Sequence, residues 1–134
     1  EGEKVCLSID LSTKGSIPLP YSGKLSWEVL PIEELQGALR VPPTIALFDY
    51  DLLGATTLTL RSREEGDALR PYGMKGKKLL RRIFIDGKYT HQERREARLV
   101  CKGSPPLWLA GYVADSTYAL SVHTRKVLRL TYHP

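Results

Sequence analysis

The sequence predicts an α+β fold, a β-rich sandwich or barrel-like mixed sheet with two or three short helices. Short apolar segments that alternate at period two recur along the chain, and turn-forming residues separate them. Helical patterns are confined to short stretches. The 134 residues, 42% hydrophobic and 26% charged, suffice for one domain with its own core, and no apolar run approaches the ~20 residues of a membrane span.

The N-terminal part of the chain is expected to be β-rich. Residues 1–11 alternate apolar with polar side chains, which predicts a strand. Residues 25–29 alternate in the same way after a Ser-Gly break and predict another strand. Residues 31–37 combine a proline near the start, acids in the first turn and a final glycine, which predicts one or two helical turns.

Two further strands are expected in the middle of the chain, over residues 44–49 and 58–61. Asp49 and Asp51 lie at the end of the first. Two carboxylates at this spacing suit metal binding or acid–base chemistry, but capping of a loop is the commoner role and no third ligand follows in the sequence. We therefore interpret them as loop-capping residues.

The C-terminal third predicts one helix and three strands. Thr90 and Glu93 have the spacing of a capping box, so a short helix is expected from there to about Ala97. Three arginines are expected on or near its surface, Arg94, Arg95 and Arg98. The closing strands are expected at residues 99–101, 107–112 and 127–132.

Groups that could support catalysis are scattered along the chain. The three histidines stand beside no Cys or Asp at ligand spacing, and no nucleophile motif is present. We therefore predict no catalytic residue and no metal site. Cys6 and Cys101 are expected to be reduced core or strand residues, since neither a disulfide nor a reactive thiol has a supporting motif.

The most distinctive segment is residues 70–86, which holds six basic residues and no acid before Asp86. From Lys77 onward, charged and apolar pairs alternate with a repeat of four, close to the 3.6 residues of a helical turn. This pattern predicts an amphipathic helix with its charges on one side. The expected apolar face comprises Leu79, Leu80, Ile83 and Phe84.

A loop with two glycines precedes this helix. Gly73 and Gly76 bracket Met74 and Lys75, and glycine permits positive φ or a close approach of the backbone to a large ligand. Free N–H groups and Lys75 in such a loop suit an anion. Phosphate is the candidate that fits best.

The positive charge of the chain is local. Residues 61–102 carry thirteen Lys or Arg against six Asp or Glu, whereas the remainder carries seven against nine, within a net charge of +5. This distribution favours an anionic partner that docks on one region. A solvated helix face that only keeps the protein soluble is the alternative. The density of like charge and the Gly-x-x-Gly entry favour a functional surface.

Several motifs resemble the C-terminal domain of tRNA(Ile)-lysidine synthetase, in the same order. The most specific are Gly66-Asp67, Arg70-Pro71, Gly73-Met74-Lys75-Gly76-Lys77-Lys78-Leu79 and Phe84-Ile85-Asp86. Further similar motifs are Phe48-Asp49, Leu58-Thr59-Leu60-Arg61, Trp108-Leu109-Ala110-Gly111 and Thr124-Arg125-Lys126-Val127-Leu128. We expect one compact fragment over residues 1–134, in which 1–44 is a β-rich segment of unassigned family and 45–134 is the C-terminal domain of that enzyme.

The resemblance implies the chemistry of a longer parent enzyme. That enzyme is a ligase that uses ATP and Mg: it adenylates a cytidine in the anticodon of isoleucine tRNA, and lysine then displaces AMP. The work belongs to an N-terminal domain with a Ser-Gly-Gly-x-Asp-Ser loop, which this chain lacks, so we expect no enzyme activity and no cofactor in the fragment. A first residue of Glu1 and a single methionine, Met74, indicate a piece cut from a longer protein. The family's domain resembles one in the β subunit of phenylalanyl-tRNA synthetase, in which strands dominate.

The resemblance also implies partners and sites. The domain is expected to bind the acceptor stem of tRNA(Ile) in the cytoplasm, beside the parent's N-terminal catalytic domain, with no role for DNA or a membrane. Expected phosphate contacts are Arg70, Lys75, Lys77, Lys78, Arg81 and Arg82, with Arg125 and Lys126 farther out. The alternative is a protein-docking or dimerisation module whose basic face meets an acidic surface of the parent enzyme.

Overall fold

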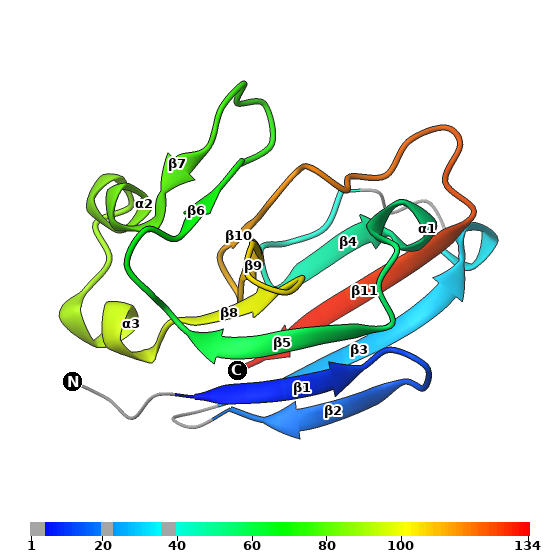
Figure 1. Cartoon of the computed structure of the whole chain (residues 1–134), viewed down its shortest axis with the longest axis horizontal. Coiled ribbons are helices and arrows are strands. Elements are labelled where there is room, and N and C mark those ends of the chain that lie inside the picture. Colours follow the sequence, from blue (N-terminus) through cyan, green and yellow to red (C-terminus); the bar gives the residue numbers. More distant parts are fainter. Residues whose placement is uncertain (1–4, 20–22, 36–39) are drawn as a thin grey trace.

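The computed structural model describes residues 5–19, 23–35 and 40–134, and most of its strands form two antiparallel sheets (Figure 1). The five-stranded sheet has the order β1 (Cys6–Asp10), β5 (Thr57–Ser62), β8 (Arg98–Cys101), β9 (Pro106–Leu109) and β10 (Val113–Ala114). The four-stranded sheet has the order β2 (Gly15–Pro18), β3 (Lys24–Pro31), β11 (Lys126–His133) and β4 (Ile45–Asp49). A separate hairpin joins β6 (Ala68–Leu69) to β7 (Lys78–Leu79). The helical segments are η1 (Ile32–Glu34), α1 (Tyr50–Leu53), α2 (Leu80–Asp86) and α3 (His91–Glu96). The predicted β-rich α+β class is confirmed.

Strands from the N-terminal part of the chain belong to both sheets. β1 pairs with β5, in the register Ile9 to Leu58, and β3 pairs with β11, in the register Leu25 to Tyr132. The predicted first strand begins at Cys6 in the structure, and residues 1–4 lie outside the described residues.

A hydrophobic core fills the space between the two sheets. The five-stranded sheet contributes alternate residues, and so does the four-stranded sheet, as expected for strands with one face turned inward. Trp108 and Phe48 are its largest fully buried side chains. The core also includes Ile9, Leu25, Ala46, Leu58, Leu60, Val100, Leu128 and Leu130.

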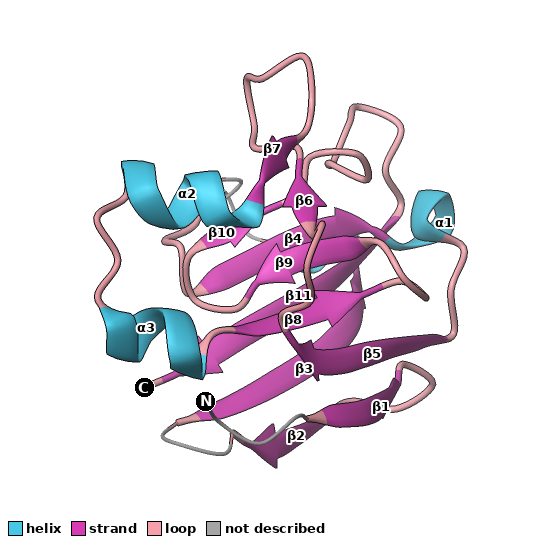
Figure 2. Ribbon diagram, turned by 60° about the vertical axis from the view of Figure 1, so that its left-hand side comes forward, coloured by secondary structure: helices cyan, strands magenta, loops and turns pink. Residues whose placement is uncertain are grey.

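The other face of the five-stranded sheet is packed chiefly by helix α2. Leu99 and Cys101 of β8 pack there with Leu80 and Phe84 of α2, whereas Val100 between them points into the inter-sheet core. β8 is therefore buried on both faces, and its side chains are apolar apart from the first. In Figure 2, α2 and α3 lie together on one side of the strands. The domain thus has three layers: helices, five-stranded sheet and four-stranded sheet.

Helix α2 begins later than the sequence predicts. The pattern placed Lys77 in the helix and Leu79 on its buried face, but Lys78 and Leu79 pair with β6 and the helix starts at Leu80. Leu79 has extended angles (φ −61°, ψ 141°), and 44% of its surface is exposed. A helix of seven residues is unstable alone, so α2 depends on the burial of the apolar side chains at positions i, i+3 and i+4. That set is Leu80, Ile83 and Phe84.

Asp49 caps the start of α1, a short helix that the sequence analysis did not predict, whereas Asp51 lies inside α1 and is exposed. The Asp49 carboxylate accepts a hydrogen bond from the Leu52 N–H (3.1 Å) at the start of α1 and another from the Thr124 hydroxyl (2.9 Å). Asp49 is thus a loop-capping residue, as interpreted from the sequence. The expected helical turn over 31–37 is η1, and residues 36–39 lie outside the described part of the chain.

Arg98 does not lie near the surface, as the sequence suggested, but is only 4% exposed. The reason is that α3 ends at Glu96, so Arg98 is the first residue of a buried strand. Its Nη1 donates to the Ala97 carbonyl at 2.8 Å. Both cysteines are free thiols; Cys101 is buried, and burial raises the pKa of its thiol to about 11.

Candidate nucleic-acid interface

The loop of residues 70–77 projects from the two-sheet body on the β6–β7 hairpin (Figure 2). Its base is fixed through the backbone of Arg70. The Arg70 N–H donates to the Asp115 carboxylate (2.8 Å), and the Arg70 carbonyl accepts from the Ser116 N–H (2.8 Å). Asp115 is 6% exposed and also accepts from the Thr117 N–H, so the anchor is itself rigid.

One of the two loop glycines has the predicted special backbone. Gly73 lies at φ +88°, and the Met74 N–H donates to the Pro71 carbonyl at 3.1 Å. A positive φ at the third residue of such a turn is the geometry of a type II turn, which glycine adopts without strain. Gly76 does not have a positive φ. The loop therefore owes its shape to Gly73.

A groove beside the hairpin gathers four of the predicted contact residues. It encloses about 490 Å³ between the end of the hairpin and the outer face of α2. Apolar side chains with substantial exposure, Leu79 (44%) and Ile85 (51%), also line it. The four cations around it are Lys77, Lys78, Arg81 and Arg82. The structure thus brings residues of a strand and a helix to one concave basic surface.

Asp86 neutralises part of this groove, which the sequence reading did not anticipate. Its carboxylate lies 2.6 Å from Lys78 Nζ and 3.7 Å from Arg82 Nε. The hydrogen bond from Lys78 lowers the pKa of Asp86, and the charges of Lys78 and Arg82 lower it further. The sequence analysis treated the basic segment as free of neutralising acids, and this was wrong. Asp86 lies four residues after Arg82, one helical turn on, so its carboxylate is on the same side of α2 as these cations.

Three of the predicted phosphate-binding cations form no ion pair with another described residue. Lys75, Lys77 and Arg81 are exposed, and none of them forms an ion pair with another described residue. The groove therefore has two cations that pair with the Asp86 carboxylate, Lys78 and Arg82, and two that are available to a ligand, Lys77 and Arg81. Lys75 adds a third available charge on the loop.

The remaining predicted contacts lie elsewhere. Arg70 is half-buried at the neck of the hairpin. Arg125 and Lys126 are exposed at the start of β11, in the four-stranded sheet, and neither lines the groove. The Arg125 carbonyl accepts from the Ile32 N–H at 2.8 Å, so its backbone is engaged in the fold.

A buried ion pair that is linked to the start of α2 was not recognised from the sequence. Arg61 and Asp67 are 8% and 9% exposed, and their guanidinium and carboxylate form two hydrogen bonds of 2.8 and 3.0 Å. Arg61 Nη2 also donates to the Ser104 carbonyl at 3.0 Å. The backbone carbonyl of Asp67 accepts from the Leu80 N–H at 2.8 Å, which ties this pair to the first residue of α2.

Aromatic and cationic contacts join α2 to α3. The rings of Phe84 and Tyr89 lie 5.1 Å apart, and those of Tyr89 and Tyr112 lie 4.8 Å apart. The guanidinium groups of Arg63 and Arg94 lie 5.4 and 5.8 Å from the centroid of the Phe84 ring. These tilted aromatic pairs and cation–π contacts help to hold the helix that bears the groove.

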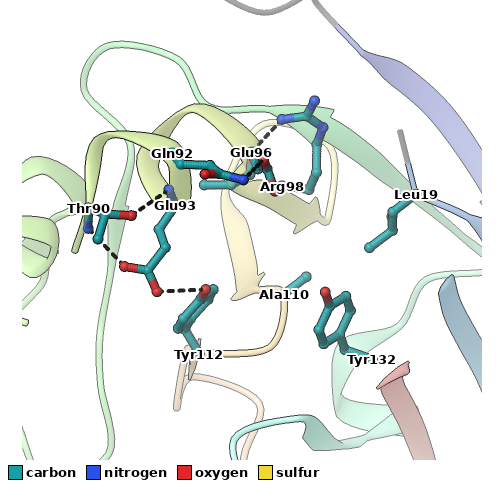
Figure 3. Close-up of a pocket in the computed structure, with 10 residues that line it drawn as sticks. Leu19, Thr90, Gln92, Glu93, Glu96, Arg98, Ala110, Tyr112 and Tyr132 are labelled. Carbon is teal, nitrogen blue, oxygen red and sulfur yellow. Dashed lines mark hydrogen bonds between the residues drawn. The ribbon is translucent and has the colours of Figure 1, made fainter. Parts of the chain in front are cut away.

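A second concave region of about 210 Å³ lies beside α3 (Figure 3). Its polar groups bind one another: Glu93 accepts from the Thr90 N–H (2.8 Å) and the Tyr112 hydroxyl (3.3 Å), and Thr90 Oγ1 accepts from the Glu93 N–H (3.0 Å). The predicted capping box is therefore confirmed. Glu96 is also in the lining. Because this region presents carboxylates, it does not suit a phosphate.

Replacing Thr90 with alanine is expected to lower the free energy of unfolding by about 1 kcal/mol, since α3 loses its N-cap hydrogen bond. Urea unfolding measures the change. His91→Ala, at the adjacent exposed position, is the control and should stay within about 0.5 kcal/mol of the parent chain. Equal losses in the two variants would show that the cap contributes nothing.

The described residues contain no group of three or more His, Cys, Asp or Glu side chains placed to hold a metal ion. None of their helices is long and apolar enough to cross a membrane.

The fold and this surface define a small two-sheet α+β domain whose exposed functional groups are cations on a hairpin and a short helix. The chain belongs to the family of the TilS substrate C-terminal domain, whose model matches residues 58–130. The crystal structure of a TilS C-terminal domain has the same fold, with a TM-score of 0.78 at 22% identity over 96% of this chain and 97% of that one.

Two curated relatives of the chain carry the same name. The chain is 37% identical over 108 residues to the tRNA(Ile)-lysidine synthase of Porphyromonas gingivalis, a match that covers 78% of this chain and 24% of that protein. It is 32% identical over 130 residues to the tRNA(Ile)-lysidine synthase of Caldanaerobacter subterraneus subsp. tengcongensis, which covers 97% and 27%. The chain thus spans about a quarter of the length of these relatives.

Proposed function

We propose that this chain is the tRNA-binding C-terminal domain of a tRNA(Ile)-lysidine synthase and that its basic groove docks on the acceptor stem of tRNA(Ile). One observation carries the proposal. Four cations from β7, α2 and the turn before them surround a single exposed groove in a domain of this family. A concave basic surface suits the regularly spaced phosphates of a duplex.

The residues around the groove divide into two roles in this proposal. Lys77 and Arg81 contact phosphates, because their charges have no described carboxylate partner. Lys78 and Arg82 are oriented by Asp86 and set the shape of the surface. Double-stranded RNA is recognised mainly through phosphates, 2′-hydroxyl groups and shape, so this arrangement reads the form of the stem. Lys75 reaches the backbone from the loop, with Arg70, Arg125 and Lys126 as outer contacts.

The rest of the reaction belongs, in this proposal, to a longer protein. Its N-terminal catalytic domain uses ATP and Mg to join lysine to the wobble cytidine, and this chain holds the distant end of the same tRNA. Within the segment 1–44, the strands β1, β2 and β3 extend the sheets of the family domain at 45–134. The setting is cytoplasmic, and neither DNA nor a membrane is a partner.

Salt dependence of tRNA binding tests this function. Filter binding of labelled tRNA(Ile) to the chain should give a linear fall of log affinity with log salt concentration, with a slope of about 0.7–0.9 per phosphate contact. The three contacts and three outer contacts proposed above therefore predict a slope between about 2 and 5.5. Binding that is absent, or that does not change with salt, would overturn the proposal.

A protein-docking or dimerisation role is the second candidate. The apolar side chains in the groove, Leu79 and Ile85, are the observation in its favour, since a phosphate backbone needs no apolar contact. Analytical ultracentrifugation separates the two functions. A dimer that forms without tRNA supports docking, whereas a change in sedimentation only on addition of tRNA supports RNA binding.

A further inference from the structure

We infer that Tyr72, at the tip of the basic hairpin, stacks on an unpaired nucleobase next to the duplex that the groove binds. The inference rests on the proposed function and deepens it: the groove binds phosphates of a paired stem, and Tyr72 takes a base that extends beyond the pairing. The ligand class is therefore a duplex RNA with a single-stranded extension, rather than a blunt duplex.

The first argument is the exposure of the ring. Tyr72 is 89% exposed, whereas the next most exposed of the described tyrosines, Tyr112, is 39% exposed and packs against Tyr89. Packing within the domain therefore does not account for Tyr72. Met74 on the same loop is also 43% exposed, so the tip presents apolar surface inside a basic segment.

The second argument is the rigidity of the backbone that carries the ring. Tyr72 lies between Pro71, whose ring fixes its own φ, and Gly73 at φ +88°. The hydrogen bond from Met74 N–H to the Pro71 carbonyl closes the turn, and both backbone groups of Arg70 are bound at its base. The backbone of such a turn loses little conformational entropy when a ligand binds to the ring that it carries.

The third argument is the placement of charge around the ring. Lys75 and Lys77 follow Tyr72 on the same loop, are exposed and form no ion pair with another described residue. Proteins that bind single strands combine aromatic rings, on which bases stack, with cations that hold the neighbouring phosphates. An uncharged ring binds a phosphate only weakly, but it can stack on the flat face of any base. The loop has both parts of this arrangement.

The experiment compares two RNA probes with the chain and its variants. One probe is a blunt hairpin duplex; the other is the same duplex with a short unpaired 3′ extension whose first base is 2-aminopurine. The parent chain should bind the extended probe more tightly and quench its fluorescence. Tyr72→Ala should weaken binding of the extended probe by about 5- to 100-fold and abolish quenching, with little change for the blunt probe.

Two further variants make the result specific. Tyr72→Phe keeps the ring and should retain both the tighter binding and the quenching. Val122→Ala, at a position that is 95% exposed on another loop, removes apolar surface without a ring and should behave as the parent chain. A loss in Val122→Ala equal to that in Tyr72→Ala would overturn the inference.

The outcomes also separate this inference from the function on which it rests. If neither probe binds in a salt-dependent way, the proposed function fails. If both probes bind equally and Tyr72→Ala changes neither, RNA binding stands and the stacking role is wrong. The same variants are also tested for binding to phosphatidylserine vesicles. If Tyr72→Ala weakens vesicle binding and leaves RNA binding unchanged, the ring contacts lipid and the inference is overturned.

Discussion

Replacing Arg61 with alanine should lower the free energy of unfolding by about 3–5 kcal/mol, because it leaves the Asp67 carboxylate buried without its cation. Arg61 is 8% exposed, and its guanidinium binds both oxygens of Asp67. Small domains have a total stability of about 5–15 kcal/mol, so this single change removes a large part of it.

The loss of stability in Arg61→Ala should also affect α2, the helix that lines the basic groove. Asp67 also accepts from the Glu64 N–H (2.7 Å), and its carbonyl accepts from the Leu80 N–H (2.8 Å). Without Arg61, the turn over residues 64–67 and the first residue of α2 lose their common anchor. We therefore expect earlier hydrogen exchange in α2 than in the four-stranded sheet.

The chain offers a matched control for this prediction. Arg129 binds Glu28 at 2.7 Å, but their side chains are 38% and 33% exposed, so Arg129→Ala should cost about 1 kcal/mol or less. The double variant Arg61→Met/Asp67→Leu removes both buried charges and should be much closer to the parent chain than Arg61→Ala. Urea unfolding gives all three values. The interpretation fails if Arg61→Ala loses no more stability than Arg129→Ala.

The sequence predicted local features well because local chemistry determines them. The Thr90–Glu93 capping box and the Asp49 cap need only residues a few positions apart, and both are present. The strands followed from alternation in the same way. The start of α2 was misplaced because Lys78 and Leu79 pair with Leu69 and Ala68 of β6, on the far side of the loop. Helical periodicity carries no information about such a pairing.

The candidate site was predictable in composition but not in detail. The basic segment does form one surface, since four of its cations line a groove. Two motif residues that contributed to the resemblance, Arg61 and Asp67, proved to be a buried structural pair. No sequence pattern distinguishes a buried charge from an exposed one. Arg125 and Lys126 were grouped with the site by their charge and by the resemblance, although the fold places them at the start of β11 in the other sheet.

Removing Lys77 and Arg81 together should reduce the salt dependence of tRNA binding. If both contact phosphates, the slope of log affinity against log salt should fall by about 1.4–1.8. Both side chains are exposed and lack a described ion-pair partner, so the free energy of unfolding should change by no more than about 1 kcal/mol. Filter binding across a salt series and urea unfolding measure the two quantities on the same protein.

Lys14→Ala/Lys24→Ala is the matched control, because it removes the same charge from exposed residues at the four-stranded sheet. A general electrostatic attraction to the whole domain would make the two double variants equal, since both lower the net charge from +5 to +3. A docked stem instead releases counterions only where side chains meet phosphates. Equal slopes in the two variants would therefore rule out the groove as the binding surface, whereas a loss confined to Lys77→Ala/Arg81→Ala places the stem against α2.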